Sequence, residues 1–400
     1  MSDQALSDVK VLDLTWYIAG PYCTKLLADH GADVIKVERP GSGDPARSLG
    51  PFWGDDPHPE KSGLFLYLNT NKKSITLNLK TETGKKLLKE LVKDVDILVE
   101  NFSPGVMSRL GLDYGTLRNL NPRLVMTSIS NFGQTGPYSG YKASHLIEGA
   151  LAGWNYVCGD LGREPLQPVG WLIHYIGGLA ATTGTLTALY RQRQRGFGQQ
   201  VDISLMEAAI PITTYITSRY LYWGIVRKRD GNFISPTGGY VARCRDGYLG
   251  VNAWTPPQRE GLYQFVGMPD ILEDPRLQTT DGQRAHAREI SARLNLYFRD
   301  KGKEETFFSA QELRLPFSPA PTTEELLTIP QFIAREYFAE VEHPVTGKVV
   351  HPGATFKMGE TPWAIRSPAP LLGEHNEAVY CQRLGYSRQE LTRLRERGTV

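Results

Sequence analysis

The sequence predicts an α/β fold built on a parallel sheet, with a second unit inserted late in the chain. Short apolar runs at 10–15 and 33–39 flank a predicted helix at 22–30, which is the spacing of a βαβ unit. This alternation of strands and helices continues to about residue 205. After Gly224 the sequence becomes rich in glycine and proline, which marks the start of a different unit.

The elements of the first half follow in order. The predicted strands are 10–15, 33–39, 74–79, 96–100, 124–129 and 199–205. The predicted helices are 22–30, 83–95, 105–120, 144–153, 178–191 and 206–223. Pro21 is expected to open the first helix and Gly31 to stop it. The stretch 169–178, which contains His174, is expected to be a loop that leads into a buried helix.

The second half is less regular. A strand is expected at 248–251, followed by mostly helical sequence to about residue 308. Three prolines, at 316, 319 and 321, mark the end of this region. Two short strands are expected within 341–356, around a turn at Gly347, and the last helix covers 387–397.

Composition excludes several classes of protein. Among 400 residues, 40% are hydrophobic and 22% are charged, which is typical of a globular protein. A net charge of +2 without a basic run argues against nucleic-acid binding. The four cysteines lack CxxC spacing, so neither a metal site nor a disulfide framework is expected. We expect a cytoplasmic protein with no membrane partner, because the first residues lack the basic start of a signal peptide and no apolar run reaches membrane-spanning length.

A parallel sheet raises the possibility of a dinucleotide enzyme, which needs a GxGxxG motif at the first strand–helix turn. The turn at 17–21 lacks this motif. Gly41 and Gly43 come after the second strand and have no third glycine. The sequence therefore disfavours a nicotinamide-dependent enzyme.

Instead, the chain contains a series of short motifs, which extend from near its N-terminus to near its C-terminus. They lie at 19–21, 31–40, 43–47, 71–77, 99–105, 121–124, 132–137, 198–202 and 371–375. Together these segments resemble the class III CoA-transferases, the CaiB/BaiF family, and the stretch from Gly224 to Tyr337 matches least. The resemblance implies a large Rossmann-like CoA-binding domain made of 1–223 and 338–400, and a smaller domain with linkers at 224–337. It also implies an interlocked dimer, with each active site between the large domain of one chain and the small domain of the other.

The resemblance further implies a pocket for CoA, which is a substrate and not a permanently bound cofactor. The matching positions are Tyr17, Arg39, Leu77, Lys80, Asn101, Phe102, Arg109, Leu110 and Lys142. The four basic residues suit the phosphates of CoA, and the apolar ones suit its adenine. A single basic residue is more often a solvated surface charge, but four in register favour CoA binding.

Two histidines stand where the family carries carboxylates. His174 matches the nucleophilic aspartate, and His145 matches a supporting glutamate or aspartate. Several members also have a glutamine at the position of Ile18. An imidazole has no carbonyl that could carry CoA as a thioester, so this chain alone is expected to be inactive as a transferase. The competing interpretation of His174 is a buried structural histidine.

Three functions remain open. The first is a subunit of a heteromeric CoA-transferase whose paralogous partner supplies the aspartate. Its expected substrates are an acyl-CoA donor, succinyl-CoA, and a carboxylic acid, with benzylsuccinate in anaerobic aromatic degradation as the specific acceptor that the resemblance suggests. The second is an acyl-CoA racemase or epimerase that uses His145 and His174 as two bases. The third is a non-catalytic CoA-binding regulatory protein.

Overall fold

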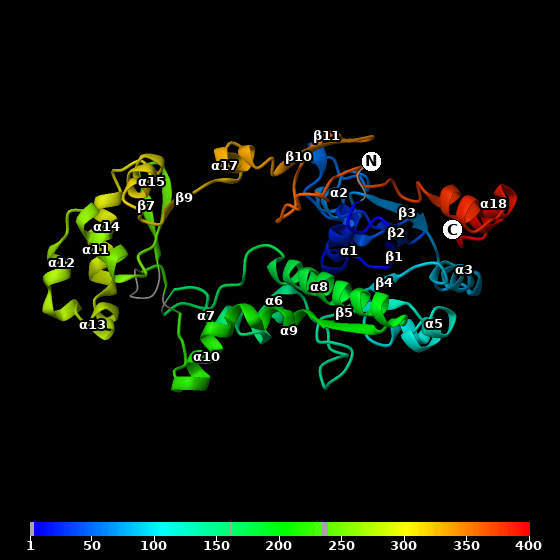
Figure 1. Cartoon of the computed structure of the whole chain (residues 1–400), viewed down its shortest axis with the longest axis horizontal. Coiled ribbons are helices and arrows are strands. Elements are labelled where there is room, and N and C mark those ends of the chain that lie inside the picture. The colour runs from blue at the N-terminus through cyan, green and yellow to red at the C-terminus, as the bar shows by residue number, and fades with distance from the viewer. Residues whose placement is uncertain (1–3, 161, 230, 234–238) are drawn as a thin grey trace. The chain divides into compact units, whose positions relative to one another are not determined.

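The computed structural model describes residues 4–160, 162–229, 231–233 and 239–400, and Figure 1 labels its elements. The chain divides into two compact units. The larger unit comprises Met1–Tyr156, Gln167–Arg227 and Tyr337–Val400, and the smaller unit comprises Val157–Leu166 and Lys228–Glu336. None of the helices in the described part of the chain combines the length and the apolar character needed to cross a membrane.

A six-stranded sheet forms the centre of the larger unit. Its strands are β1 (Lys10–Asp13), β2 (Asp33–Glu38), β3 (Lys72–Thr76), β4 (Ile97–Glu100), β5 (Val125–Ser130) and β6 (Gln200–Ser204). Every neighbouring pair is parallel, and the order is β3-β2-β1-β4-β5-β6. This is the order of a doubly wound Rossmann sheet, so the predicted α/β class with a parallel sheet is confirmed.

Helices cover both faces of the sheet. The helices of the larger unit are α1 (Ala19–Asp29), α2 (Gly63–Leu68), α3 (Glu82–Val92), α4 (Val106–Arg109), α5 (Tyr114–Leu120), α6 (His145–Leu151), α7 (Trp154–Val157), α8 (Leu172–Arg195), α9 (Leu205–Ala209), α10 (Thr214–Trp223) and α18 (Arg388–Glu396). Short 3-10 turns lie at η1 (Pro45–Ser48), η2 (Trp53–Asp55) and η3 (Ile210–Thr213), and a π-helical turn, η5, lies at Ala378–Arg383.

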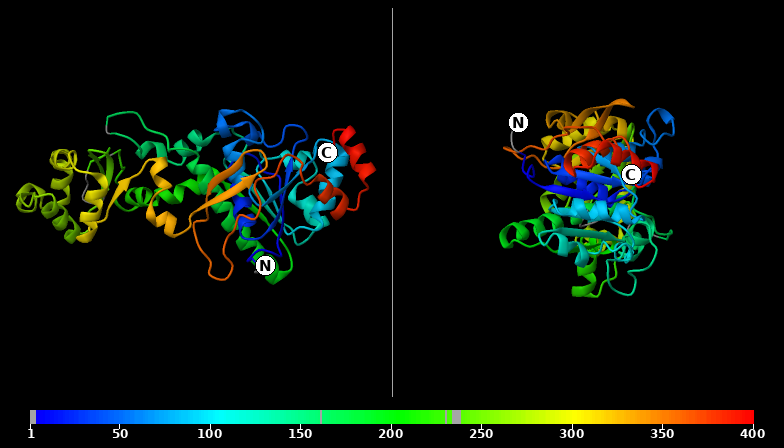
Figure 2. Two further views of the ribbon diagram at one scale, coloured as in Figure 1. Left: turned by 90° about the horizontal axis from the view of Figure 1, so that it is seen from above. Right: turned by 90° about the vertical axis from the view of Figure 1, so that its right-hand side faces the viewer.

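Each face of the sheet has its own apolar core. One core joins β1, β2, β4 and β5 to α1, α8 and α9 through side chains such as Val11, Leu27 and Ala181. The other joins the opposite faces of these strands to α3, α5 and the C-terminal segment, through side chains such as Leu12, Leu88 and Leu391. Figure 2 shows the C-terminal helix, in red, beside the cyan helices of this second face.

Antiparallel strands occupy the rest of the chain. The larger unit has a hairpin of β10 (Phe338–His343) and β11 (Gly347–Pro352), which confirms the two strands expected around Gly347. The smaller unit has a sheet of β7 (Tyr240–Cys244), β8 (Gly247–Val251) and β9 (Phe317–Ala320). Its helical elements are α11 (Pro256–Phe265), α12 (Asp270–Glu273), η4 (Pro275–Leu277), α13 (Thr280–Ala285), α14 (Ala287–Phe298), α15 (Lys303–Glu312), α16 (Thr323–Leu326) and α17 (Pro330–Ala334).

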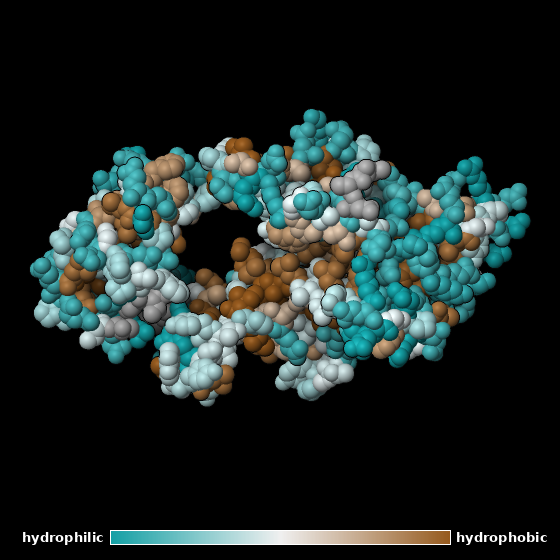
Figure 3. Space-filling model, in the orientation of Figure 1, coloured by the Kyte–Doolittle hydropathy of each residue, from teal (hydrophilic) through white to brown (hydrophobic). Residues whose placement is uncertain are grey.

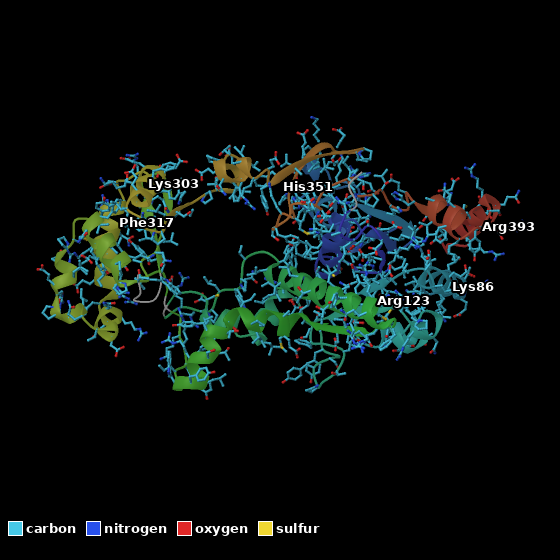
Figure 4. The ribbon with its side chains drawn as sticks, in the orientation of Figure 1. Lys86, Arg123, Lys303, Phe317, His351 and Arg393 are labelled. Atoms are coloured by element: carbon cyan, nitrogen blue, oxygen red, sulfur yellow. The ribbon has the colours of Figure 1, made fainter. Side chains whose placement is uncertain are left out.

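The smaller unit has an apolar core of its own. Phe317 on β9, which Figure 4 labels, is buried in it. Its ring meets those of Phe265 and Phe298 edge to face. At its edge, Lys303 donates to both carboxylate oxygens of Glu325, at 2.6 and 2.7 Å. A separate core is what allows this part of the chain to form a unit by itself.

Three predicted elements are wrong in their boundaries. The predicted helix at 105–120 is two helices, α4 and α5, because Gly111 takes a left-handed φ of 66° and Asp113 caps a new helix. The predicted helix at 206–223 is interrupted by η3, since Pro211 has no N–H to donate within a helix. Pro21 is the third residue of α1 and not its first, which is tolerated because the first four N–H groups of a helix have no intrahelical partner.

The prediction for 169–178 is also corrected. The loop ends at Gly170, whose φ is 60°, and α8 begins at Leu172, well before the expected position 178. His174 therefore lies in the first turn of a 24-residue helix and not in the preceding loop. The loop prediction failed because the glycine pair 177–178 was interpreted as part of a turn, whereas both glycines lie inside the helix.

Candidate active site

A cavity of about 810 Å³ opens at the carboxyl ends of β1 to β4 in the larger unit. Ligands of open α/β sheets bind outside the carboxyl ends of the strands, where the strand order reverses, and in this sheet that point lies between β1 and β4. We call this site the strand-end cavity. Its lining residues are Leu14, Trp16, Tyr17, Val37, Glu38, Arg39, Pro40, Ser42, Leu77, Asn78, Leu79, Lys80, Asn101, Phe102, Ser103, Val106, Leu110 and Gly398.

Seven of the nine residues expected to hold CoA lie together in this lining. They are Tyr17, Arg39, Leu77, Lys80, Asn101, Phe102 and Leu110. Arg109 and Lys142 are exposed and are not part of it. On α4, Val106 and Leu110 are one turn apart and share a face, so the intervening Arg109 projects elsewhere.

Aromatic rings and a guanidinium shape one wall of the cavity. Arg39 stacks on the ring of Trp16, with 3.9 Å between the guanidinium carbon and the ring centroid. Trp16 meets Phe102 edge to face, with centroids 5.3 Å apart. Asn101 fixes this wall, since its side chain accepts from Trp16 N at 2.9 Å and donates to Trp16 O at 2.8 Å. Arg39 and Lys80 remain exposed and available to an anionic ligand.

Fully buried ion pairs lie beneath the cavity. Lys36 pairs with Asp44 at 2.8 Å, and Lys72 pairs with Asp13 at 3.0 Å. Burial alone would raise the pKa of Asp13, but the charges of Lys72 and Lys36 outweigh it and lower that pKa. Burial lowers the pKa of Lys72 to about 8, even though Asp13 opposes this change. Charges at this depth are stable only because each has a partner.

Arg47 and Glu38 extend this network. Arg47 donates through Nε to Glu38 Oε2 at 2.7 Å and through Nη2 to Oε1 at 2.9 Å, a two-point contact. Burial raises the pKa of Glu38, but the hydrogen bonds and charge of Arg47 reverse the shift and leave the pKa lowered. The network also reaches the rim of the cavity, where Asp44 Oδ1 accepts from Tyr17 N at 3.1 Å. Tyr17 takes a left-handed φ of 64°, which is uncommon for a tyrosine.

A second group of polar side chains lies where α6 faces the first turn of α8. We call Asn131, His145, Glu148, Trp171 and His174 the histidine cluster. His174 Nε2 lies 3.0 Å from Glu148 Oε2, and the side chains are 17% and 1% exposed. In the amide orientation that satisfies both of its ends, Asn131 donates to Glu148 Oε1 at 3.2 Å and accepts from Ala143 N at 3.2 Å.

His145 is held differently. Its Nε2 lies 3.3 Å from the carbonyl oxygen of Pro168, and its Nδ1 is buried with no hydrogen-bond partner among the described residues. The ring centroids of His145 and His174 are 5.9 Å apart, and that of Trp171 lies 6.0 Å and 5.6 Å from them. The structure thus brings the two predicted histidines together, but only His174 has a carboxylate partner.

Sequence reasoning missed several members of both sites. The sequence offers Glu148 as a possible substitute for the aspartate, but its contact with His174 was missed. Glu148 lies three residues after His145 on a predicted helix, and this spacing could have placed both on one face. Asn131 and Gly398 gave no signal, since each lies far along the chain from the residues that it joins. Asp160 and Glu164 are the other two carboxylates that the sequence offers as substitutes for the aspartate, and both belong to the smaller unit.

The helix α8, which carries His174, packs against α1, and α1 begins beside the strand-end cavity. Gly178, one turn after His174, lies so close to α1 that an added Cβ would be 2.7 Å from the carbonyl oxygen of Ala19. Tyr175 meets Tyr22 of α1 edge to face, with centroids 4.9 Å apart. Because Tyr17 immediately precedes α1 and lines the cavity, the contact between α1 and α8 connects the two sites.

Comparisons with known proteins agree with this arrangement. The profile of CoA-transferase family III matches residues 6–376. A succinyl-CoA–D-citramalate CoA-transferase of Chloroflexus aurantiacus is 33% identical over 99% of this chain and 98% of its own length. The alpha subunit of a succinyl-CoA–L-malate CoA-transferase of Chloroflexus aurantiacus is 32% identical over 99% of this chain and 92% of its own.

A solved structure gives the same answer. The crystal structure of a CaiB/BaiF family protein from Brucella suis superimposes with a TM-score of 0.84 at 27% identity, covering 95% of this chain and 99% of that one. The sequence profile, the relatives and the structural neighbour therefore agree over nearly the whole chain: it belongs to CoA-transferase family III, the CaiB/BaiF family of enzymes.

Proposed function

We propose that this chain is the CoA-binding subunit of a heteromeric CoA-transferase, and that a related partner chain supplies the nucleophilic aspartate. The division into a large domain, 1–223 with 338–400, and an inserted domain, 224–337, belongs to this proposal, as does the interlocking of the two chains. The reaction moves CoA from an acyl-CoA donor to a carboxylic acid. Binding and chemistry are divided between the two subunits.

The strand-end cavity supports CoA binding. Arg39 and Lys80 offer exposed cations for phosphate, and Trp16, Leu77 and Phe102 offer apolar surface for the adenine. Arg109 and Lys142 lie outside this lining, so we assign them a weaker role at the far end of the ligand. The residues that match the family's CoA site are thus largely one physical pocket.

The observation that carries the proposal is the state of position 174. It holds an imidazole, and the carboxylate closest to it, Glu148, is buried behind that imidazole with both oxygens engaged. A carboxyl group that carries CoA must first reach a thioester carbonyl and form an anhydride. Glu148 has no such access in this arrangement, so the covalent step falls to another chain.

Exposed apolar side chains support a partner chain. Figure 3 shows apolar residues gathered over the region of α6, α8 and α9. The exposed ones there include Leu146, Ile147, Leu151, Trp171, Leu172, Leu179, Ile210 and Ile212. The neighbouring α10 has no buried residue and exposes Tyr222 and Trp223. Contiguous apolar surface of this kind is typical of protein–protein contacts.

The names of the relatives suggest the substrates. Two of them use succinyl-CoA as donor and the dicarboxylic acids D-citramalate or L-malate as acceptors. We therefore propose succinyl-CoA as donor and a dicarboxylic acid as acceptor. Benzylsuccinate, a dicarboxylic acid with an aromatic substituent, is the specific acceptor to test first.

Reconstitution tests the proposal. The chain is purified alone and together with a family III paralogue from the same host that has aspartate at the position of His174. Transfer from succinyl-CoA to benzylsuccinate, D-citramalate and L-malate is measured, and hydroxylamine traps the enzyme-bound acyl or CoA adduct. Transfer by the pair only, with the adduct on the partner, is the expected result. An adduct on Glu148, or transfer by the chain alone, would contradict it.

The racemase alternative is not favoured by the geometry. A two-base mechanism needs His145 and His174 free to exchange protons with substrate, whereas Nε2 of His145 is taken by the Pro168 carbonyl and its Nδ1 is buried. A regulatory CoA-binding protein remains the other alternative. It predicts that the paralogue reaches its full rate without this chain.

A further inference from the structure

Glu148 and His174 are arranged in a way that a site without catalytic function would not require. The carboxylate is 1% exposed and the imidazole 17% exposed, so the acid lies behind and the imidazole in front. Glu148 Oε2 contacts Nε2, and Asn131 holds the other carboxylate oxygen. The carboxylate is thereby fixed from two sides and orients the ring of His174.

The contact with Glu148 also determines which ring nitrogen of His174 can accept a proton. An ionised carboxylate can only accept hydrogen bonds, so a charged Glu148 requires that Nε2 of His174 carry the proton. Nδ1 then keeps its lone pair. Nδ1 has no hydrogen-bond partner in the described part of the chain, and a neutral imidazole in this state is a general base.

The first turn of α8 provides a second feature beside this base. Trp171, the residue before the helix, makes no side-chain cap, so the N–H groups of Leu172 and Ile173 have no capping side chain. The first intrahelical bond into this turn is from Tyr175 N to Trp171 O, at 3.1 Å. Uncapped N–H groups at the positive end of a long helix can stabilise a developing oxyanion.

We infer that His174 is a general base, held in place by Glu148, and that this site hydrolyses acyl-CoA thioesters with water as the nucleophile. His174 is the catalytic residue and Glu148 is a positioning residue. The inference rests on the proposed CoA binding of this chain, but it adds an activity that needs neither the partner's aspartate nor a second substrate acid.

The step balances without any further reagent. Nδ1 of His174 takes a proton from water as the water oxygen bonds to the thioester carbonyl carbon. The carbonyl electron pair moves onto its oxygen, which the N–H groups of the first turn of α8 stabilise. The carbonyl then re-forms, the carbon–sulfur bond breaks, and the CoA thiolate takes the proton from Nδ1. The products are a carboxylic acid and CoA.

Two neighbouring chemistries fit the geometry less well. Direct attack by Glu148 needs access that a 1% exposed carboxylate lacks. Removal of an α-proton with return from the other face needs a second free base, and His145 is engaged and buried. Water is small enough to reach a half-buried imidazole, and no covalent carrier is required.

The experiment uses the full chain without partner, with succinyl-CoA and glutaryl-CoA as substrates in water enriched in ¹⁸O. Release of CoA thiol gives the rate, and mass spectrometry locates the label. CoA affinity is measured in parallel by calorimetry. The variants are His174→Ala, Glu148→Gln and His286→Ala. The last is a matched control, because His286 and Glu289 form a similar pair at 3.2 Å on the surface of the smaller unit.

We expect thiol release with one ¹⁸O in the product acid. His174→Ala should lower kcat about 100-fold or more, as loss of a general base does. Glu148→Gln should lower kcat at least tenfold with KM and CoA affinity unchanged, and His286→Ala should have no effect. A defect in folding alone would lower CoA affinity together with kcat.

Three results would overturn the inference while leaving CoA binding intact. They are wild-type release no faster than that of His174→Ala, ¹⁸O incorporated into Glu148, or, in a parallel reaction in deuterated water, deuterium at the α-carbon without thiol release. Absence of CoA binding by the wild-type chain would instead contradict the proposed function and remove the ground of this inference with it.

Discussion

The strand-end cavity and the histidine cluster are built in opposite ways. Beneath the cavity, buried charged side chains pair with one another inside the larger unit: Asp13 with Lys72, Lys36 with Asp44, and Glu38 with Arg47. In the histidine cluster, Nδ1 of His145 lacks a partner among the described residues, and the surrounding α6 and α8 expose leucines and a tryptophan. The comparison indicates that the larger unit pairs the charges beneath the strand-end cavity by itself, whereas the histidine cluster keeps a ring nitrogen that is unpaired in the described part of the chain, and exposed apolar side chains around it.

The largest test of this contrast is to break the buried network. Arg47→Ala removes the positive charge and the two hydrogen bonds that Arg47 gives to Glu38 and leaves the charge of Glu38 buried, which should lower the free energy of unfolding by about 3–5 kcal/mol. Urea unfolding measures the change. Arg193→Ala is the matched control, because the pair of Arg193 and Asp8 is 44% and 67% exposed and should contribute about 0–1 kcal/mol. Equal losses would show that the network is not what supports the cavity.

A pH series tests a further buried acid, Glu100. Burial raises the pKa of Glu100 at the end of β4 to about 7, although Ser128 and the Phe102 N–H oppose the shift. The folded chain therefore holds this proton at pH values where the unfolded chain has lost it, so the free energy of unfolding falls as pH rises toward about 7. The loss from this one group is about 3 kcal/mol.

Glu100→Gln removes that dependence. The variant should gain stability relative to wild type as pH rises from 5 to 8, and Glu312→Gln, at an exposed position, controls for the loss of a carboxylate. Unfolding in urea at several pH values gives both curves. Parallel curves for wild type and Glu100→Gln would mean that Glu100 is ionised in the fold.

Ligand binding sharpens the contrast further. Arg39→Ala and Lys80→Ala should each weaken CoA binding tenfold or more, since a charge-assisted contact contributes about 1.5–3 kcal/mol. Lys142→Ala should have a smaller effect, because Lys142 lies outside the cavity lining. Calorimetry on the three variants measures this order. An equal loss at Lys142 would place the phosphates away from Arg39 and Lys80.

The smallest effect is expected at the other site. His174→Asp restores a carboxylate, but it places this negative charge near Glu148, whose Oε2 now lies 3.0 Å from the imidazole Nε2. The variant still lacks the supporting carboxylate that the family carries at the position of His145 and the glutamine that several members carry at the position of Ile18. The transfer rate of the proposed heteromer should stay within about threefold, and the isolated variant should not transfer CoA. Transfer by the isolated variant would show that the site needs only its aspartate.

The accuracy of the fold prediction depends on whether a feature follows from a repeated sequence pattern or from a single residue. The parallel sheet was predictable because short apolar runs alternate with amphipathic segments from Lys10 to Ser204. Helix boundaries failed where one residue overrides the pattern, as Gly111 and Pro211 do. The start of α8 failed because Gly177 and Gly178 resemble a turn, while in the fold they allow α8 to approach Leu205 and α1 closely.

The two sites also differ in how far the sequence predicts them. The family resemblance placed Arg39 and Asn101 in one pocket, and they do line one cavity because parallel strands end at the same edge of a sheet. The pairing of His174 with Glu148 could not be read from spacing, because it depends on how α6 packs against α8. Gly398 joins the cavity from the end of the chain, and no local pattern predicts such a contact.

The left-handed backbone of Tyr17 has a consequence for how a ligand is received. This conformation costs a tyrosine about 1–2 kcal/mol, and the hydrogen bond from its N–H to Asp44 holds it in place. Since Asp44 is itself held by buried Lys36, the bend in the cavity wall is formed when the chain folds. If CoA binds here as proposed, we expect this wall to need little rearrangement, so that little affinity is lost to the ordering of loops. Association should therefore follow simple one-step kinetics, and Tyr17→Gly should make the protein more stable but the binding slower and looser.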